Sequence, residues 1–204
     1  MITLYGSARS SAGRCFWCLE EVKAPYNAVE VNFRTKEHKS DLFLKINPNG
    51  KIPAMVDDDV TLFESMAINF YLAEKYKKDL LGTTLQEKGY VYQWSIWAIA
   101  EVQPPIIEAF IQKVFVPEDK RDLGLIEKSL AQVPAFLKIL EDRLGDSKYL
   151  AGNEFTLADL NTASVVSILN HIQYDLSSYK NLSNWLTVLS EREGFRKYAA
   201  LLQK

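Results

Sequence analysis

The pattern of hydrophobic and polar positions changes once along this chain. Up to about residue 78, short apolar runs of strand length alternate with amphipathic helical stretches and with turn formers. Beyond a linker at residues 77–84, every long stretch has the spacing that is typical of a helix. The sequence therefore predicts an α/β domain over residues 1–78 and an all-α domain over residues 85–204.

The first domain is predicted to contain four short strands and three helices. Its first helix places four apolar residues, Cys15 and Val22 among them, at i, i+3, i+4 and i+7, which forms one apolar stripe. Three consecutive aspartates, Asp57 to Asp59, predict a polar hairpin turn between the last two strands. The expected strands are residues 2–5, 27–31, 53–56 and 60–63, and the expected helices are residues 14–23, 37–46 and 66–73.

The second domain is predicted to consist of long helical stretches only. Pro104-Pro105 predicts a kink or break in the first of them, and Pro134 predicts a bend in the second. The third begins with a capping box, in which Thr156 is the N-cap and Asp159 occupies position N3. We interpret Asp159 as structural rather than catalytic. The expected helical stretches are residues 85–114, 123–144, 157–172 and 182–202.

Composition and charge restrict the class of protein without identifying it. The chain has 204 residues, of which 48% are hydrophobic and 25% are charged, as in an ordinary globular protein. A formal net charge of −2 gives no reason to expect nucleic acid or a membrane surface as a partner. No apolar run approaches the ~18 residues of a membrane span, and the chain opens on a strand rather than a signal peptide, so we expect a cytoplasmic protein. Two cysteines and two histidines argue against a disulfide framework or a dedicated metal site.

The stretch from Asn47 to Tyr76 carries the clearest chemistry. A run of turn formers precedes Ile52-Pro53, and an X-Pro bond before a strand is the usual place for a cis peptide. Glu64 and Ser65 directly precede a strong helical run, so Ser65 is the expected N-cap and Glu64 lies at the positive end of the helix dipole. Such a site offers amides to an extended peptide, a helix N-terminus to a carboxylate and a glutamate to an ammonium group. A small peptide with a free α-amino and a free α-carboxyl group fits all three.

These motifs closely resemble the glutathione-binding half of the glutathione transferase family, and the resemblance covers the whole chain. It implies a thioredoxin-like domain with a mixed four-stranded sheet, followed by a C-terminal all-helical bundle that lines the electrophile pocket. It also implies a homodimer with glutathione as co-substrate. In the family, the Ile52-Pro53 turn holds the cysteinyl backbone of glutathione, and the Glu64-Ser65 pair holds its γ-glutamyl end.

The segment around His38 and Lys39 is similar to one that closes over the glycine carboxylate of glutathione in phi-like members. The resemblance implies that Lys39 supplies charge there and His38 a hydrogen bond. A solvated charged helix is the alternative interpretation. Lys51 occupies the position where the family often has a glutamine against glutathione, and a lysine there can still meet a carboxylate.

The loop after the first strand contains the candidate catalytic residues. Ser10 lies five residues after Tyr5 and four before Arg14, which resembles the serine-type, theta-like and phi-like transferases. In that arrangement the Ser10 hydroxyl donates a hydrogen bond to the glutathione sulfur and stabilises its thiolate. Ser11 is the second candidate, and Tyr5 is the third because other classes use a tyrosine at the end of this strand. Both serines could instead serve only as helix caps.

A second chemistry is suggested by Cys15 and Cys18, whose spacing is that of a redox C-x-x-C motif. The resemblance to glutaredoxins would place the reactive pair at Ser10 and Gly13, so we favour packing as the role of both cysteines.

The expected function is transfer of glutathione to small electrophilic or peroxide substrates. The alternatives are a glutathione-dependent thiol–disulfide oxidoreductase or peroxidase, and a non-catalytic binding protein of the same fold. Conjugation, peroxide reduction, isomerisation and dehalogenation all stay open as the physiological reaction.

Overall fold

The protein consists of two compact units, as seen in a computed structural model that describes residues 1–203. The first unit runs from Met1 to Leu81 and includes the chain again from Ser190 onward, and the second unit is Gly82–Leu189. The sequence placed residues 190–204 with the helical domain, whereas in the structure the described part of this segment groups with the sheet; residue 204 lies outside the described residues. A mixed four-stranded sheet with helices, followed by a helical unit, confirms the predicted fold class.

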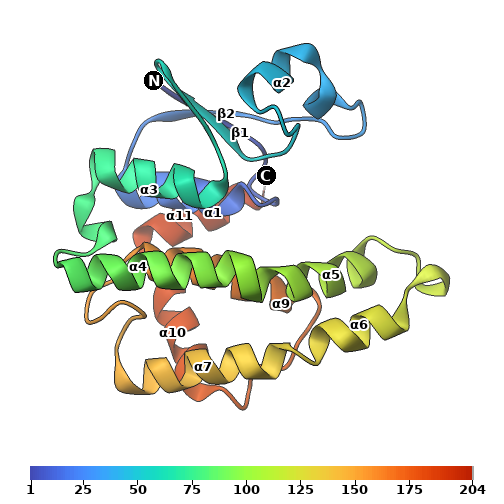
Figure 1. Cartoon of the computed structure of the whole chain (residues 1–204), viewed down its shortest axis with the longest axis vertical. Helices are drawn as coiled ribbons and strands as arrows, with labels where there is room; N and C mark the ends of the chain where they lie inside the picture. The colour runs from blue at the N-terminus through green and yellow to red at the C-terminus, as the bar shows by residue number, and fades with distance from the viewer. Residues whose placement is uncertain (204) are drawn as a thin grey trace. The chain divides into compact units, whose positions relative to one another are not determined.

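The sheet of the first unit has the strand order β2-β1-β3-β4 (Figure 1). β1 pairs in parallel with β2 and antiparallel with β3, which pairs antiparallel with β4. The alternation along β1 buries Ile2 and Leu4 completely and turns Thr3 and Tyr5 to the other face. The strands are β1 (Ile2–Tyr5), β2 (Tyr26–Val29), β3 (Ala54–Asp57) and β4 (Val60–Phe63).

Helices cover both faces of this sheet. Figure 1 shows α1 (Gly13–Val22) and α3 (Ser65–Tyr76) against one face and α2 (Asp41–Ile46) on the other. Two 3₁₀ turns, η1 (Glu37–Lys39) and η2 (Lys78–Leu81), connect the longer elements.

A small apolar cluster lies between α2 and the sheet, at the end where β1 finishes and β3 begins. Val31, Phe43 and Ala54 are its buried members, and the ring of Tyr5 meets that of Phe43 edge-on at 6.0 Å. Val31 was expected inside the second strand, but that strand ends at Val29, and Val31 packs in the following loop.

The expected single helix at residues 182–202 is wrong, because the structure divides it into α10 (Lys180–Ser190) and α11 (Glu193–Leu201). The chain is extended at Arg192, whose guanidinium donates two hydrogen bonds of 2.9 and 2.8 Å to the buried Glu21 carboxylate on α1. The Trp17 indole donates to the same carboxylate at 3.1 Å. A helix that continued through Arg192 would lose this partly buried ion pair and leave the buried Glu21 carboxylate without its cation, which explains the break.

The named elements of the second unit are all helices. The break expected at Pro104-Pro105 is present, but it lies on the turn before these two prolines. The first helical stretch is interrupted by a π-helical turn, η3 (Ala98–Val102), just before Pro104 and Pro105. Neither proline can donate an N–H to the carbonyl four residues earlier, so the irregularity falls on that preceding turn. The remaining elements are α4 (Leu85–Trp97), α5 (Gln103–Val114), η4 (Glu118–Lys120), α6 (Leu123–Leu130), α7 (Val133–Asp146), α8 (Leu157–Val166) and α9 (Ile168–His171).

Two capping boxes fix helix starts in this unit. The predicted box at Thr156 and Asp159 is confirmed at the start of α8. A second box, Thr84 with Glu87 at the start of α4, escaped the sequence analysis although its T-x-x-E spacing is visible. None of the helices within residues 1–203 is long and apolar enough to cross a membrane.

Candidate active site

The strand register brings the predicted site segments to one end of the sheet. Tyr5 at the end of β1 pairs with Val29 at the end of β2 and with Ala54 at the start of β3, and Ala54 also pairs with Phe63 at the end of β4. The loop after β1, the Ile52-Pro53 turn before β3 and Glu64 after β4 therefore share this edge. Segments that are far apart in sequence are thus neighbours at the site.

An open cavity of about 1010 Å³ lies at this edge. Four of the predicted site residues, Ser10, Ser11, Lys51 and Ile52, line it together. Another wall is formed by residues 30–34, which follow β2 and which the sequence did not predict as part of the site. Its signal was topological, since a loop that leaves β2 beside β1 must lie at the same edge as the serine loop. The remaining lining residues are Ser7, Glu30, Val31, Asn32, Phe33 and Arg34.

Ser10 is held in a tight turn just before α1. Its hydroxyl donates to the carbonyl of Ser7 at 2.7 Å and accepts the N–H of Ala12 at 3.1 Å. The backbone adds two hydrogen bonds to this turn. The Ser10 N–H donates to the Ser7 carbonyl, and the Gly13 N–H donates to the Ser10 carbonyl. The helix N-cap is Ala12, so neither serine is the cap residue that the simpler interpretation expected. The half-buried hydroxyl therefore both donates one hydrogen bond and accepts one within its own loop.

Ser11 and Tyr5, the other two candidates, make contacts different from those of Ser10. The exposed Ser11 donates its hydroxyl to the carbonyl of Ile52 at 2.9 Å, which ties the serine loop to the turn before β3. The Tyr5 ring packs in the apolar cluster against Phe43. The Ser11 hydroxyl thus joins two loops, and the Tyr5 ring packs in the interior of the first unit.

The turn before β3 has the conformation that its sequence predicted. The Ile52-Pro53 bond is cis, and Gly50 has a positive φ of 60°. The buried Asn47 holds the turn, because its side-chain amide donates to the carbonyl of Lys51 at 2.6 Å and its side-chain oxygen accepts the N–H of Asn49. Lys51 is left exposed at the cavity wall.

Glu64, not Ser65, is the N-cap of α3, so the expected cap assignment is wrong. Glu64 has φ 72° and ψ 114°, a conformation that a residue with a side chain rarely adopts. Ser65 is the first helical residue and is buried. The Glu64 carboxylate is exposed and caps no helix N–H group. Unusual backbone of this kind is often retained at binding sites, where it presents a side chain to a ligand.

His38 and Lys39 do not line the cavity themselves but stand behind its wall. The His38 ring stacks on Phe33, a lining residue, at 4.3 Å. The Lys39 ammonium donates to the carbonyl of Asn49 at 3.1 Å, and a side chain at Gly50 would come within 2.6 Å of it. The His38 Nδ1 atom is buried without a hydrogen-bond partner among the described residues.

Both cysteines are free thiols in the buried interior of the first unit. The Cys15 sulfur faces the carbonyl of Ser65 at 3.6 Å, and the Cys18 sulfur faces that of Asn69 at 3.8 Å. Burial raises the pKa of Cys15 to about 12 and raises the pKa of Cys18 well above its usual range. Protonated, enclosed thiols are poor nucleophiles, which agrees with a packing role.

Electrostatics and donor chemistry at the site do not point to a metal. The described residues contain no group of three or more His, Cys, Asp or Glu side chains that could hold a metal ion. The cavity is instead lined by serine hydroxyl groups, the cationic side chains of Arg34 and Lys51 and the anionic side chain of Glu30. Such a set suits an organic ligand that carries charged and hydrogen-bonding ends.

The fold and the cavity define a class of protein before any comparison is made: a thioredoxin-like domain with a serine loop beside a cis-proline turn, and an all-helical unit. The family model described as glutathione S-transferase, N-terminal domain, matches residues 1–74, and the model for the C-terminal domain matches residues 102–193. The chain is 36% identical to glutathione S-transferase 1 of Zea mays, over 98% of this chain and 96% of that protein.

Solved structures give the same result. Glutathione S-transferase I from maize, in complex with an atrazine glutathione conjugate, has a TM-score of 0.91 at 36% identity and covers 99% of this chain and 98% of its own. The theta class glutathione S-transferase from Xanthomonas axonopodis pv. citri, with glutathione bound, has a TM-score of 0.90 at 27% identity over 96% of this chain and 95% of its own. This chain belongs to the glutathione transferase family. The predicted family and enzyme class are thereby confirmed.

Proposed function

We propose that this transferase activates the glutathione thiol through Ser10 and directs the thiolate at a small electrophile bound in the cavity beside it. The observation that carries the proposal is the position of the Ser10 hydroxyl, half-buried on the cavity wall at the start of α1. A hydroxyl donor and the positive end of a helix both favour a thiolate over a thiol.

The mechanism requires the Ser10 proton to exchange one acceptor for another. In the free enzyme the hydroxyl donates to the Ser7 carbonyl, and the Ala12 N–H donates to the hydroxyl oxygen. Rotation about the Cβ–Oγ bond turns the proton to the glutathione sulfur while the Ala12 bond persists and strengthens the donor. Lowering a thiol pKa by ~2 units corresponds to about 3 kcal/mol, which one such bond and a helix terminus can supply.

The rest of glutathione is assigned to the remaining predicted residues. Glu64 receives the γ-glutamyl ammonium group, since its strained backbone presents an exposed carboxylate beside the buried Ser65. Ile52-Pro53 offers its backbone to the cysteinyl unit in the manner of strand addition. Lys51, which lies at the cavity wall, is assigned to the glycine carboxylate. His38 and Lys39 are assigned to the same carboxylate from the family resemblance, and because they stand behind the wall, Lys39 must release the Asn49 carbonyl to reach it.

While the helical domain keeps the role in lining the electrophile pocket that the family resemblance implies, we assign the wall formed by residues 30–34 to the electrophile as well. The exposed ring of Phe33 supplies an apolar surface there, and the relatives solved with bound conjugates carry a lactoyl group or atrazine on glutathione. Detoxification of small apolar electrophiles is therefore the proposed role. We place it in the cytoplasm, where glutathione is kept reduced.

A homodimer is part of the proposal. On α4, the residues Leu85, Tyr92 and Ile96 fall at i, i+7 and i+11, and all three are exposed, Leu85 to 88%. Gly89 lies between them with open space around its Cβ position, so a second helix could approach closely. An apolar stripe of this kind on a helix is typical of an interface between two copies.

The proposal is tested by calorimetric titration with glutathione and by ultraviolet thiolate absorbance of the complex as a function of pH. We expect binding, a thiol pKa ~2 units below that of free glutathione, and conjugation of a chromogenic aryl halide. Binding with an unshifted pKa and no conjugation would contradict the proposal and favour a ligand-binding role. Failure to bind glutathione would favour a non-catalytic member of the family.

The cysteine variant separates the transferase from an oxidoreductase. Replacing Cys15 and Cys18 together by alanine or serine should leave kcat for conjugation within about threefold of the wild type, because both thiols are buried and protonated. The double alanine variant is the better choice, since it does not bury new hydroxyl groups. Loss of thiol–disulfide exchange in a variant that still folds, with melting temperature as the control, would instead support the oxidoreductase.

A further inference from the structure

The serine loop is attached to the far end of the chain at two points. Immediately before Ser10, the Arg9 guanidinium donates to the backbone carbonyl of Leu202, just beyond α11, at 2.6 Å. One residue earlier, the Ala8 carbonyl accepts the hydroxyl of Tyr198 on α11 at 3.4 Å. The residues that flank the proposed thiol activator are thus held by a segment almost 200 positions away in sequence.

Tyr198 contacts the loop at both of its ends. Its hydroxyl lies 2.8 Å from the position that a Cβ atom of Gly13 would occupy, and the Ala8 carbonyl lies 2.6 Å from the same position. Any side chain at Gly13 would push these groups apart. The Tyr198 ring lies parallel to that of Trp17 at 6.4 Å and meets Phe195 edge-on at 5.8 Å, which fixes its orientation.

Helix α11 packs against α1 along its length. The Phe195 ring packs edge-on against Trp17 at 4.9 Å, and Glu193 pairs with Lys23 at 3.1 Å. The partly buried Arg192–Glu21 pair described above lies at the N-terminal end of this contact. The serine loop therefore leads into α1 and is hydrogen-bonded to the α11 segment, and these two helices pack against each other. Arg9 also lies where a cation complements the C-terminal carbonyls of α11.

We propose that Arg9 and Tyr198 are positioning residues, through which α11 holds the Ser10 hydroxyl at hydrogen-bonding distance from the glutathione sulfur. The inference rests on the proposed role of Ser10. Displacement of the Arg9 peptide carries the Ser10 backbone with it, and a hydrogen bond to sulfur weakens steeply with distance and angle. The C-terminal segment thereby sets the pKa of the bound thiol without touching the substrate.

The test compares Arg9→Ala with Arg9→Lys, which keeps a single donor for the Leu202 carbonyl. We expect Arg9→Ala to raise the pKa of the bound thiol by ~0.5–1 unit and to lower kcat about three- to tenfold at pH 6.5. The loss should shrink at alkaline pH, where the thiolate forms without help, and KM for glutathione should change little. Arg9→Lys should restore most of kcat, and Tyr198→Phe should give a smaller shift in the same direction.

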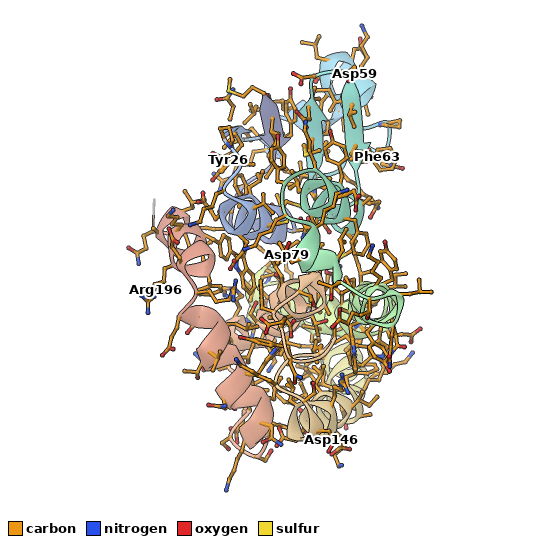
Figure 2. All side chains as sticks on the ribbon, turned by 90° about the vertical axis from the view of Figure 1, so that its left-hand side faces the viewer. Tyr26, Asp59, Phe63, Asp79, Asp146 and Arg196 are labelled. Carbon is orange, nitrogen blue, oxygen red and sulfur yellow. The ribbon has the colours of Figure 1, made fainter. Side chains whose placement is uncertain are left out.

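The matched control is Arg196→Ala, which removes an arginine from α11 that does not contact the serine loop. Figure 2 shows Arg196 on the outside of α11, and its side chain is exposed. This variant should keep the wild-type thiol pKa. A folded Arg9→Ala enzyme, checked by thermal melting, that binds glutathione with an unchanged thiol pKa would overturn the inference.

A double variant separates the two proposals. In a Ser10→Ala background, Arg9→Ala should cause no further rise in thiol pKa, because its effect passes through the missing hydroxyl. A full additional rise would overturn the positioning role while leaving Ser10 in place. If Ser10→Ala itself leaves the thiol pKa unchanged, the proposed function fails irrespective of what Arg9→Ala does.

Discussion

Ser10→Ala should lower kcat for conjugation ~10²-fold near pH 6.5 and return the pKa of bound glutathione almost to that of the free thiol. The substitution removes the donor to the sulfur and also the acceptor of the Ala12 N–H, yet it leaves the backbone ties of the loop in place. Binding of glutathione should weaken only slightly, because the other assigned contacts are untouched. Stopped-flow or steady-state conjugation across pH, with thiolate absorbance, measures both quantities.

Ser11→Ala is the matched control, since it removes the neighbouring hydroxyl from the same cavity wall. In the structure this hydroxyl donates a hydrogen bond to the Ile52 carbonyl. Its loss should therefore loosen the turn before β3 and raise KM for glutathione a few-fold. The thiol pKa should stay depressed. If the shift in thiol pKa disappears in Ser11→Ala and survives in Ser10→Ala, the activator is Ser11 and the site moves by one residue.

Much of this site was predictable because its signals are local. The turn before β3 is encoded locally, because the Asn47 side chain bonds nearby backbone groups, Gly50 tolerates a positive φ and Pro53 fixes its own φ. The hairpin at Asp57 to Asp59 follows from alternation and turn chemistry. The capping box at the start of α8 is a four-residue pattern. Features that a few consecutive residues determine can be read from one sequence.

The parts that were missed depend on contacts between distant residues. The break at Arg192 is stabilised by Glu21, and its local sequence signal is limited to Gly194, which by itself does not end a helix. The cavity wall at residues 30–34 has no periodicity, and only the strand register places it beside the serine loop. Glu64 as N-cap was missed because its positive φ contradicts the ordinary preference of glutamate. At each of these points, tertiary contacts or the geometry of the site outweigh the conformational preference of the local sequence.

Asp159→Ala should lower the free energy of unfolding by ~4 kcal/mol, the largest stability loss expected from a single substitution in the second unit. The carboxylate is fully buried and accepts four hydrogen bonds, from the Leu150 N–H, the Thr156 N–H and hydroxyl, and the Trp185 indole. Alanine leaves these buried donors without an acceptor and removes the capping box of α8. Urea denaturation followed by tryptophan fluorescence and circular dichroism measures the loss.

The control for burial is Glu87→Ala, which removes the equivalent carboxylate from the capping box of α4. Glu87 makes the same reciprocal bonds with Thr84, together with bonds to Thr83, but it lies near the surface where water can replace it. Its loss should cost far less than that of Asp159. Equal losses would show that the stabilisation by Asp159 comes from the cap alone and not from its buried donors.

The pH dependence of stability gives Asp159 a second, independent signature. Burial raises the pKa of its carboxyl group to about 6 despite the four donors, whereas in the unfolded chain the pKa is close to ~3.9. Between these values the folded state binds the proton and the unfolded state does not, so the contribution of this group is largest below about pH 4 and declines until about pH 6. The difference in unfolding free energy between the wild type and Asp159→Ala should therefore shrink as the pH rises through this window and then stay constant. A difference that grows with pH would mean that the four donors outweigh burial and hold the carboxylate ionised.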